Sequence, residues 1–241
     1  MANFFVDKSE IEKDIALITG DEASHIIKTL RMGVGDSLTL FDGEGGCADA
    51  VIESVSQKEV LAKIIERYSS ETEPRLKITL FQGIPKNPKM DLIVQKATEI
   101  GVCEIVPVKT KRVIVKGDKD SKTERLRRIA FEAAKQCGRA FVPHVADPLS
   151  FEDALKKAKE CDRIIIPYEC EKEGKLLGSL FENVNSVAIF IGPEGGFEES
   201  EVEKALSYGA KKVTLGKRIL RTETAGLITA ALCLYIAGDM G

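Results

Sequence analysis

The sequence predicts an α/β protein with two domains, a small β-rich domain followed by a larger one built on a parallel sheet. Apolar residues alternate with polar ones over 36–66, which is typical of strands with one buried face. Residues 68–77, YSSETEPRLK, have the composition of a linker. Continuous apolar runs then alternate with amphipathic helical patterns, as in sheets covered on both faces. We therefore expect domains at 1–72 and 73–241.

The first domain should contain three successive strands and one short helix. Three pairs of turn-forming residues divide the stretch 36–66: Asp42-Gly43, Gly45-Gly46 and Ser56-Gln57. The segment 21–31, DEASHIIKTLR, has a helical pattern, with Asp21 as its expected N-cap and Gly33 just beyond its end.

The second domain should alternate strands and helices. We expect strands at 76–82, 104–108, 163–167, 186–192 and 211–216. We expect helices at 88–100, 121–138, 151–159, 198–208 and 222–237. This alternation favours parallel strands joined by helical crossovers.

Composition excludes several classes of protein. A net charge of −3, with 44% hydrophobic and 30% charged residues, is that of an ordinary globular protein. No apolar run approaches the roughly 18 residues of a membrane span, and the N-terminus lacks a signal-peptide pattern, so we expect a cytoplasmic protein. Six cysteines without a CxxC pair and only two histidines argue against a disulfide framework and against a bound metal.

Charge is distributed unevenly along the chain. Residues 1–70 carry seven basic and thirteen acidic side chains, a net of −6, which leaves +3 for the remainder. Within that remainder, 109–128 carries nine basic and three acidic side chains, a net of +6. Such a run forms either a solvated face or a contact with a polyanion such as RNA.

Three expected strands end in unusual turns. These are IIIPYEC (164–170), IFIGPEGGF (189–197) and VTLGKRILRTETAG (213–226). Ligands of open α/β sheets bind at the carboxyl ends of the strands, so the three turns should line one pocket.

The glycine-rich turn matches neither GxGxxG nor GxxxxGK[ST]. Its glycines are expected to adopt positive φ and to let the backbone approach a ligand: Gly192, Gly195 and Gly196. Pro193 stiffens the turn, and Glu198 and Glu199 open the next helix. Carboxylates at a helix start disfavour a phosphate there, so the pattern predicts a ligand that is neutral or cationic nearby.

The third turn combines a glycine, a helix cap and charged residues. Gly216 ends a strand, Thr222 is the expected N-cap of the last helix, and Glu223 follows in its first turn. Arg221 precedes the cap and can reach into a cleft. Each residue also has a purely structural interpretation, as a turn glycine, a cap and a carboxylate at a helix start.

Together these motifs resemble the RsmE family of small-subunit ribosomal RNA methyltransferases, which belong to the SPOUT class. The likeness rests on IGPEGGF followed by LGKRILRTETA, on KNPKMDLIVQKATEIGV (86–102) and on EAAKQCGR (132–139). The segment ASHIIKTLRMGVGD (23–36) is similar to the PUA-like domain of that family. The motifs occur in the family's order, and the likeness covers nearly the whole chain.

The resemblance implies a fold, a cofactor and a reaction. The second domain would be a SPOUT methyltransferase domain with a C-terminal trefoil knot, a rare exception to the rule against threaded chains. The first domain would be a small PUA-like β-barrel that binds RNA. The protein would act as a homodimer with its site near the subunit interface. It would use S-adenosyl-L-methionine to methylate N3 of uridine 1498 in the 16S rRNA of the small ribosomal subunit.

S-adenosyl-L-methionine is a sulfonium without a phosphate, so it fits the neutral or cationic ligand expected at the glycine-rich turn. The resemblance and the three turns give these cofactor-binding candidates: Ile166, Pro167, Ile191, Gly192, Pro193, Glu194, Gly195, Gly196, Leu215, Gly216, Ile219, Leu220, Arg221, Thr222 and Thr224. The isoleucines and leucines among them have an equally simple interpretation as core residues.

The proton on uracil N3 must leave during methylation. Glu194 and Glu223 are candidate bases, water is a third, and the sequence does not decide among them. Arg221 is the candidate for stabilising the uracil anion.

RNA contacts should come from basic side chains, mostly those of the second domain, because the first is acidic. The candidates are His25, Lys28, Arg31, Lys86, Lys89, Lys111, Arg112, Lys116, Arg125, Arg127, Arg128 and Arg139. An RNA-binding or ribosome-assembly protein without catalysis would share this basic run but would not need three intact loops. A nucleotide-dependent enzyme would need a phosphate fingerprint, which the sequence lacks.

Overall fold

A computed structural model of the chain describes residues 2–7, 10–86, 88–112, 120–168, 178 and 183–240. The chain forms two compact units. The first consists of Met1–Glu73 together with Ala134–Val142, and the second of Pro74–Ala133 and Pro143–Gly241. The domain boundaries expected from the sequence put 134–142 in the second domain, whereas the structure packs this short return segment into the first unit.

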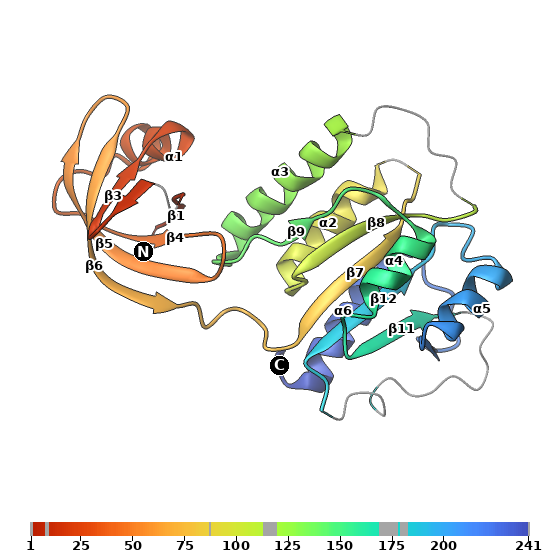
Figure 1. The fold of residues 1–241 in the computed structure, drawn as a ribbon. Coiled ribbons are helices and arrows are strands. Elements are labelled where there is room, and N and C mark those ends of the chain that lie inside the picture. Colours follow the sequence, from red (N-terminus) through yellow and green to blue (C-terminus); the bar gives the residue numbers. More distant parts are fainter. Residues whose placement is uncertain are drawn as a thin grey trace. The chain divides into compact units, whose positions relative to one another are not determined.

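The first unit contains a six-stranded sheet in the order β1-β4-β5-β6-β3-β2 (Figure 1). Its strands are β1 (Asn3–Phe5), β2 (Ile11–Glu12), β3 (Ile15–Ile18), β4 (Ser37–Phe41), β5 (Gly46–Val55) and β6 (Val60–Ser69). The three strands predicted over 36–66 are therefore confirmed as β4, β5 and β6. Asp42 closes the first of the two turns between them, because its Oδ1 accepts from the N–H groups of Glu44 and Gly46, both at 2.8 Å.

The helix predicted over 21–31 forms, but with different ends and geometry. It begins as α1 (Gly20–Ser24) and continues as the π-helical turns of η2 (His25–Leu30). Thr19, in extended conformation, occupies the N-cap position, so the prediction for Asp21 is wrong and that residue lies in the first turn. The helix ends where Arg31 turns left-handed at φ 55°, two residues before Gly33.

The second unit is built on seven parallel strands, and the predicted parallel sheet is confirmed. Six follow the order β10-β8-β7-β12-β11-β13, and β9 pairs with β8. The strands are β7 (Lys77–Gly83), β8 (Glu104–Lys109), β9 (His144–Val145), β10 (Leu149–Ser150), β11 (Arg163–Pro167), β12 (Ser186–Ile191) and β13 (Lys211–Val213). The two-residue β9 and β10 were not predicted, because two residues carry no detectable periodicity. β13 ends before the predicted residue 216, where Gly216 turns the chain at φ 97°.

Helices cover both faces of this sheet (Figure 1). They are α2 (Lys89–Ile100), α3 (Asp120–Cys137), α4 (Phe151–Ala158), α5 (Glu199–Ser207) and α6 (Thr222–Ala237). α2, α3 and α6 pack with alternate strand residues such as Ile189, and α4 and α5 pack with the others, such as Phe190. Because both faces of β12 are buried, its sequence is apolar without alternation.

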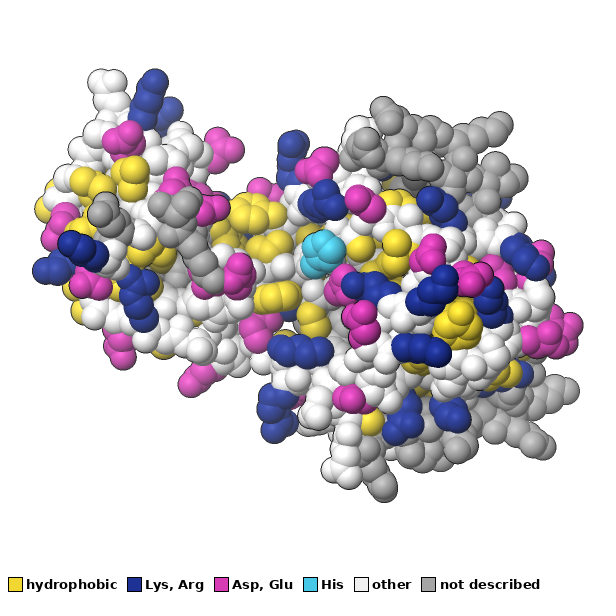
Figure 2. All heavy atoms as spheres, in the orientation of Figure 1, with side chains coloured by type: hydrophobic (Ala, Val, Ile, Leu, Met, Phe, Trp, Pro, Cys, Tyr) yellow, Lys and Arg dark blue, Asp and Glu magenta, His cyan; other side chains and the backbone are white. Residues whose placement is uncertain are grey.

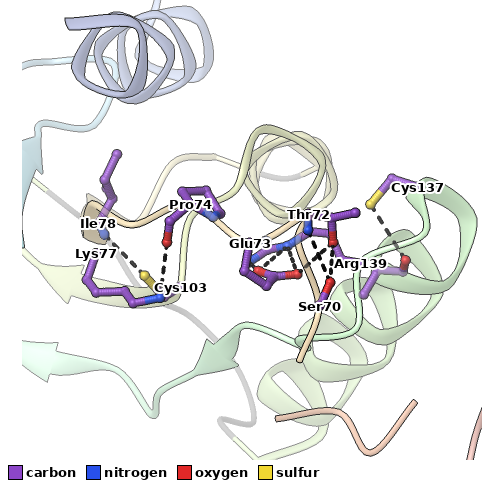
Figure 3. A network of polar contacts seen from close by, with 10 residues as sticks. Ser70, Thr72, Glu73, Pro74, Lys77, Ile78, Cys103, Cys137 and Arg139 are labelled. Atoms are coloured by element: carbon purple, nitrogen blue, oxygen red, sulfur yellow. Dashed lines mark hydrogen bonds and ion pairs between the residues drawn. The ribbon is translucent and has the colours of Figure 1, made fainter. Parts of the chain in front are cut away.

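The return segment 134–142 joins the first unit through a buried ion pair. Arg139 Nη2 donates to Glu73 Oε2 at 2.7 Å, and Arg139 is only 5% exposed (Figure 3). Backbone bonds run from Val142 N–H to Gly43 O and from Gly45 N–H to Ala140 O. The prediction that Arg139 contacts RNA is wrong for this structure, because its guanidinium is buried against a carboxylate.

The end of the linker and the start of β7 make contacts within the second unit. Lys77 Nζ donates to Pro74 O at 3.1 Å, and the Cys103 thiol accepts from the N–H of Ile78 at 3.1 Å (Figure 3). Among the described residues, no helix is long and apolar enough to cross a bilayer, and no three His, Cys, Asp or Glu side chains gather as they would around a metal ion.

Candidate active site

A cavity of about 360 Å³ lies at the carboxyl ends of β11 and β12, beside the start of α6. This volume is within the range of about 300–1,000 Å³ that is usual for ligand sites. Its lining residues are Lys89, Pro167, Ile191, Gly192, Pro193, Glu194, Gly196, Phe197, Ile219, Leu220, Arg221, Thr222 and Ala225.

A smaller cavity of about 90 Å³ shares Pro167, Ile219, Leu220 and Ala225 with the first. The remaining residues of its wall are Tyr168, Thr214, Leu215, Gly216, Lys217 and Arg218. The structure therefore brings together the described residues of the three strand-end turns that the sequence singled out, and Glu169 and Cys170 of the first turn lie outside the described residues. Adjacent parallel strands end at the same edge of the sheet, which is why turns distant in sequence meet.

Three predicted cofactor residues lie outside both cavity walls. Ile166 is fully buried in the core shared with α4 and α5. Gly195 lies against the side chain of Arg112, and Thr224 is on the exposed side of α6.

The glycines of the turn have different conformations from those predicted. Gly196 has φ 66°, but Gly192 and Gly195 do not have positive φ, so that part of the prediction is wrong. Gly192 is required for packing instead, because a Cβ there would lie 3.0 Å from the backbone of Gly196. Gly83, at the end of β7, has a similar role, since a Cβ would lie 2.7 Å from Pro193 Cδ. The glycine turn therefore packs closely both on the end of β7, through Pro193, and on its own backbone, through Gly192 and Gly196.

Thr222 has a buried polar role rather than the predicted capping role. Arg221 occupies the N-cap position of α6, and Thr222 is its first helical residue. The Thr222 hydroxyl donates to Gly192 O at 2.6 Å and accepts from Gln82 Nε2 at 2.9 Å. Gln82 is fully buried in β7, and this pair links the start of α6 to the glycine turn. Gln82 was not among the predicted site residues, although a polar residue within the apolar run LKITLFQ was a usable signal.

Lys89 and two carboxylates form a charged cluster at the cavity, which we call the carboxylate–lysine clamp. Lys89 Nζ lies 3.1 Å from Glu223 Oε2 and 3.4 Å from Glu194 Oε1. The N–H of Lys86 donates to both oxygens of Glu194, at 3.1 and 3.2 Å. Lys89 was predicted only as an RNA contact, and its position in the cavity wall is a finding of the structure.

The clamp keeps all its members charged. Hydrogen bonding to Glu223 raises the pKa of Lys89. The pKa of Glu223 is lowered, chiefly by a bond from its own backbone N–H and then by Lys89. Burial acts to raise the pKa of Glu194, but bonds from its own N–H, the Lys86 N–H and Lys89 outweigh this effect and lower it. Both carboxylates are therefore weak bases at neutral pH.

Arg221 and the exposed Ile219 complete the mouth of the cavity. Ile219 is 82% exposed and Arg221 is also exposed, although both line the cavity wall. An exposed arginine beside an apolar surface suits an aromatic base with developing negative charge.

The predicted RNA contacts are distributed over both units. In the first unit the His25 ring packs edge-on to Phe4, with ring centroids 6.0 Å apart, and Lys28 and Arg31 follow on η2 and at its end. In the second unit Lys and Arg side chains spread over the visible face among acidic ones (Figure 2).

Several basic side chains of the second unit pair with neighbours. Arg125 forms an ion pair with Asp91, and Arg127 Nη2 lies 3.2 Å from Asp147 Oδ1. Arg128 is exposed on α3. Lys116 lies outside the described residues. Lys111 donates to Ser200 in the first turn of α5, and Arg112 donates to the glycine turn itself.

Comparisons with known proteins place the chain among ribosomal RNA methyltransferases. A family profile described as an RNA methyltransferase domain matches residues 72–234, and one described as an RNA methyltransferase PUA domain matches 18–65. The ribosomal RNA small subunit methyltransferase E of Bacillus subtilis strain 168 is 35% identical over 247 residues, covering 98% of this chain and 96% of that protein.

Solved structures show the same likeness. The ribosomal RNA small subunit methyltransferase E of Neisseria gonorrhoeae, bound to S-adenosyl methionine, superimposes with a TM-score of 0.86 at 31% identity and covers 98% of each chain. A putative methyltransferase from Legionella pneumophila, in complex with the cofactor SAM, gives 0.83 at 30% identity and covers 98% of this chain and 97% of that one. The match over both domains, together with three strand-end turns meeting at one cavity, means that this chain belongs to the RsmE family of ribosomal RNA small subunit methyltransferases.

Proposed function

We propose that this protein transfers a methyl group from S-adenosyl-L-methionine to N3 of uridine 1498 in 16S rRNA. The observation that carries the proposal is the cavity where the three turns meet, with Arg221, Lys89 and Glu194 in its wall and Glu223 paired with Lys89. Membership of the RsmE family supports the reaction class and the RNA target.

The cavity fits a sulfonium cofactor. Ile191, Phe197 and Leu220 give it apolar walls, and Glu194 places a carboxylate in it, which favours a cationic ligand. Helix α5 begins with a carboxylate capping box, in which Glu198 accepts from the N–H of Glu201 and Glu201 accepts from the N–H of Glu198, so its N-terminus is not arranged to bind a phosphate. Bound S-adenosyl-L-methionine supplies an electrophilic methyl group.

The residues of this chain hold the base and stabilise its charge. Arg221 stabilises the anion that forms as uracil N3 loses its proton. Glu194 and Glu223 fix Lys89 at the cavity, and their lowered pKa values weaken both carboxylates as proton acceptors for uracil N3. Orientation of the base relative to the methyl group supplies much of the rate enhancement.

The cofactor is tested by calorimetry with S-adenosyl-L-methionine and with ATP. Binding of S-adenosyl-L-methionine alone is expected, whereas binding of ATP alone would overturn the proposal. The RNA target is tested by mass spectrometry of small-subunit RNA from cells lacking this protein. The N3-methyluridine should disappear and should return with the wild-type gene but not with Arg221→Ala.

RNA affinity is proposed to depend mostly on the basic run of the second unit. Neutralising Lys111, Arg112 and Lys116 together should weaken RNA binding and make it less dependent on salt. The slope of log affinity against log salt concentration should fall by about 0.7–0.9 for each phosphate that these side chains neutralise. An unchanged slope in a salt titration would contradict this assignment. The PUA-like domain is proposed to add contacts from His25, Lys28 and Arg31.

The assembly and the finer topology are part of the same proposal. Four apolar side chains of α6 are exposed at the spacing of one helical face: Ile228 (43%), Leu232 (39%), Tyr235 (66%) and Ile236 (36%). Such a face supports a homodimer that buries it. We also propose the trefoil knot of the SPOUT class for the C-terminal part of the chain, and a cytoplasmic location.

A further inference from the structure

We infer that Arg112 is a positioning residue that couples RNA binding to cofactor binding. It would do so by holding the glycine turn while its remaining donors take an RNA phosphate. This inference rests on the proposed function, because it assigns a second ligand contact to a residue beside the cofactor site.

Arg112 contacts the glycine turn directly. Its Nη1 donates to the backbone carbonyl of Gly195. Its aliphatic stem packs on the same residue, since a Cβ at Gly195 would lie 3.3 Å from Arg112 Cδ and 3.7 Å from Arg112 Cβ. A side chain at position 195 would therefore crowd Arg112, whereas Gly195 has no positive φ and does not line the cavity. Gly195 lies between Glu194 and Gly196, both of which line the cavity.

A buried carboxylate fixes the chain segment that carries Arg112. Glu201 of α5 is 3% exposed, and it accepts from the N–H of Lys111 at 2.9 Å and from the N–H of Glu198 at 2.9 Å. Lys111 Nζ also donates to Ser200 Oγ at 2.8 Å. The end of β8 is thus tied to the start of α5 on one side of the glycine turn, so that Arg112 has a fixed anchor from which to hold Gly195.

Arg112 keeps donors for a second partner. A guanidinium has five N–H donors in a planar fork, and the Gly195 carbonyl takes one of them. Arg112 is exposed and lies near the start of the basic run, whose net charge is +6 over 109–128. Arginine binds phosphate through two parallel N–H bonds, so an RNA phosphate can bind without displacing the carbonyl. A bound phosphate would then immobilise the Arg112 side chain, which in turn holds the glycine turn in place.

The consequence is positive coupling between the two ligands. RNA that immobilises Arg112 stabilises the turn in its cofactor-binding form, and by reciprocity the cofactor strengthens RNA binding by the same factor. Arg112→Lys should remove this coupling while conserving the charge, because an ammonium is a point charge without a planar fork.

The test measures binding of labelled S-adenosylhomocysteine, which cannot react, with and without saturating unmodified 16S rRNA transcript. For the wild-type protein RNA should lower the dissociation constant about 5–10-fold, within the usual range of coupling between sites. For Arg112→Lys the ratio should fall to about one. Gly195→Ala, whose added methyl group crowds the stem of Arg112, should weaken the coupling from the other side of the contact.

Arg128→Ala is the matched control, because Arg128 is an exposed arginine of the same basic run on α3. It should weaken RNA binding but leave the coupling ratio unchanged. Wild-type coupling in Arg112→Lys, or a ratio of one in the wild-type protein, would overturn the inference and leave the proposed function intact. Failure of the wild-type protein to bind S-adenosylhomocysteine would overturn both.

Discussion

Three separate chain segments supply the charged residues of the clamp, Lys89, Glu194 and Glu223. Their charges act as one cluster at the cavity. Lys89 begins α2, Glu194 lies in the glycine turn and Glu223 lies in the first turn of α6. One cation between two carboxylates leaves the carboxylate–lysine clamp with a net negative charge, which suits a sulfonium ligand. Arg221 adds a separate cation at the exposed mouth, where the base would enter.

Removal of Arg221 should affect turnover and spare cofactor binding. We expect Arg221→Ala to lower kcat by about 10²–10³-fold, the usual effect of removing one donor to a developing anion. The dissociation constant for S-adenosyl-L-methionine should stay nearly unchanged. Single-turnover kinetics and calorimetry measure the two quantities, with Lys156→Ala on the exposed side of α4 as a control. A large reduction of cofactor affinity with normal turnover at saturation would contradict this role.

Removal of Lys89 should lower stability in a pH-dependent way. Lys89→Met leaves Glu194 and Glu223 without their shared cation, so their pKa values should rise toward the ordinary value of about 4.3. In the wild-type protein both carboxylates have lowered pKa values, so their ionised forms stabilise the fold at any pH above the ordinary carboxyl pKa. This contribution disappears as the pH falls through the lowered values. The raised pKa of Lys89 keeps its own contribution complete at pH 7.

Urea unfolding of both proteins at neutral pH and at a pH below the pKa values of both carboxylates checks this prediction. The variant should be less stable at neutral pH, and the difference should disappear in acid. An equal difference under both conditions would mean that the methionine acts through packing and not through charge.

At the scale of elements, α6 contributes to three features at once. Its first turn supplies Thr222 and Glu223 to the site, its buried side packs on the sheet through Ala230, Cys233 and Leu234, and its outer side exposes an apolar face. Burial raises the pKa of Cys233 to about 12, so this thiol is an inert core residue. The helix is apolar all round, which predicts burial on both sides.

Introducing charge on the outer face of α6 should dissociate the proposed homodimer. We expect Leu232→Glu to halve the mass measured by size exclusion with light scattering, because a carboxylate would be buried without a partner. Leu206→Glu on α5 is the matched control, since Leu206 is 40% exposed and Leu232 is 39% exposed. A wild-type protein that is already monomeric would refute the proposed dimer.

At the scale of the whole molecule, the chain crosses between its two units more than once. Helix α3 leaves the second unit near Ala133, and 134–142 then packs in the first unit beside Phe41 and Cys47. Glu73, at the end of the first unit, meets Arg139 of this return segment. The buried ion pair therefore connects the return segment to Glu73, the residue at which the chain first leaves the first unit.

Breaking this ion pair should destabilise the protein without a direct effect on RNA binding. Removing one partner of a buried pair leaves an uncompensated charge, so Arg139→Ala should lower the free energy of unfolding by about 3–5 kcal/mol. Urea unfolding measures this, and Arg128→Ala on the surface of α3 should change it by less than about 0.5 kcal/mol. Full stability combined with weakened RNA binding would instead support a role for Arg139 as an RNA contact.

The sequence by itself determined the alternation of strands and helices, the parallel sheet and the three turns that carry the site. These follow from local periodicity and from glycine and proline placement, which act within a few residues. Only the tertiary structure decided the long-range contacts: Gln82 with Thr222, Lys89 between two glutamates, Arg112 against Gly195 and Arg139 against Glu73. Even the shortest of these, from Glu73 to Arg139, spans 66 positions, and no local pattern encodes such a partner. The same limit explains why a lysine that looked like an RNA contact belongs to the cavity and an arginine that looked exposed is buried.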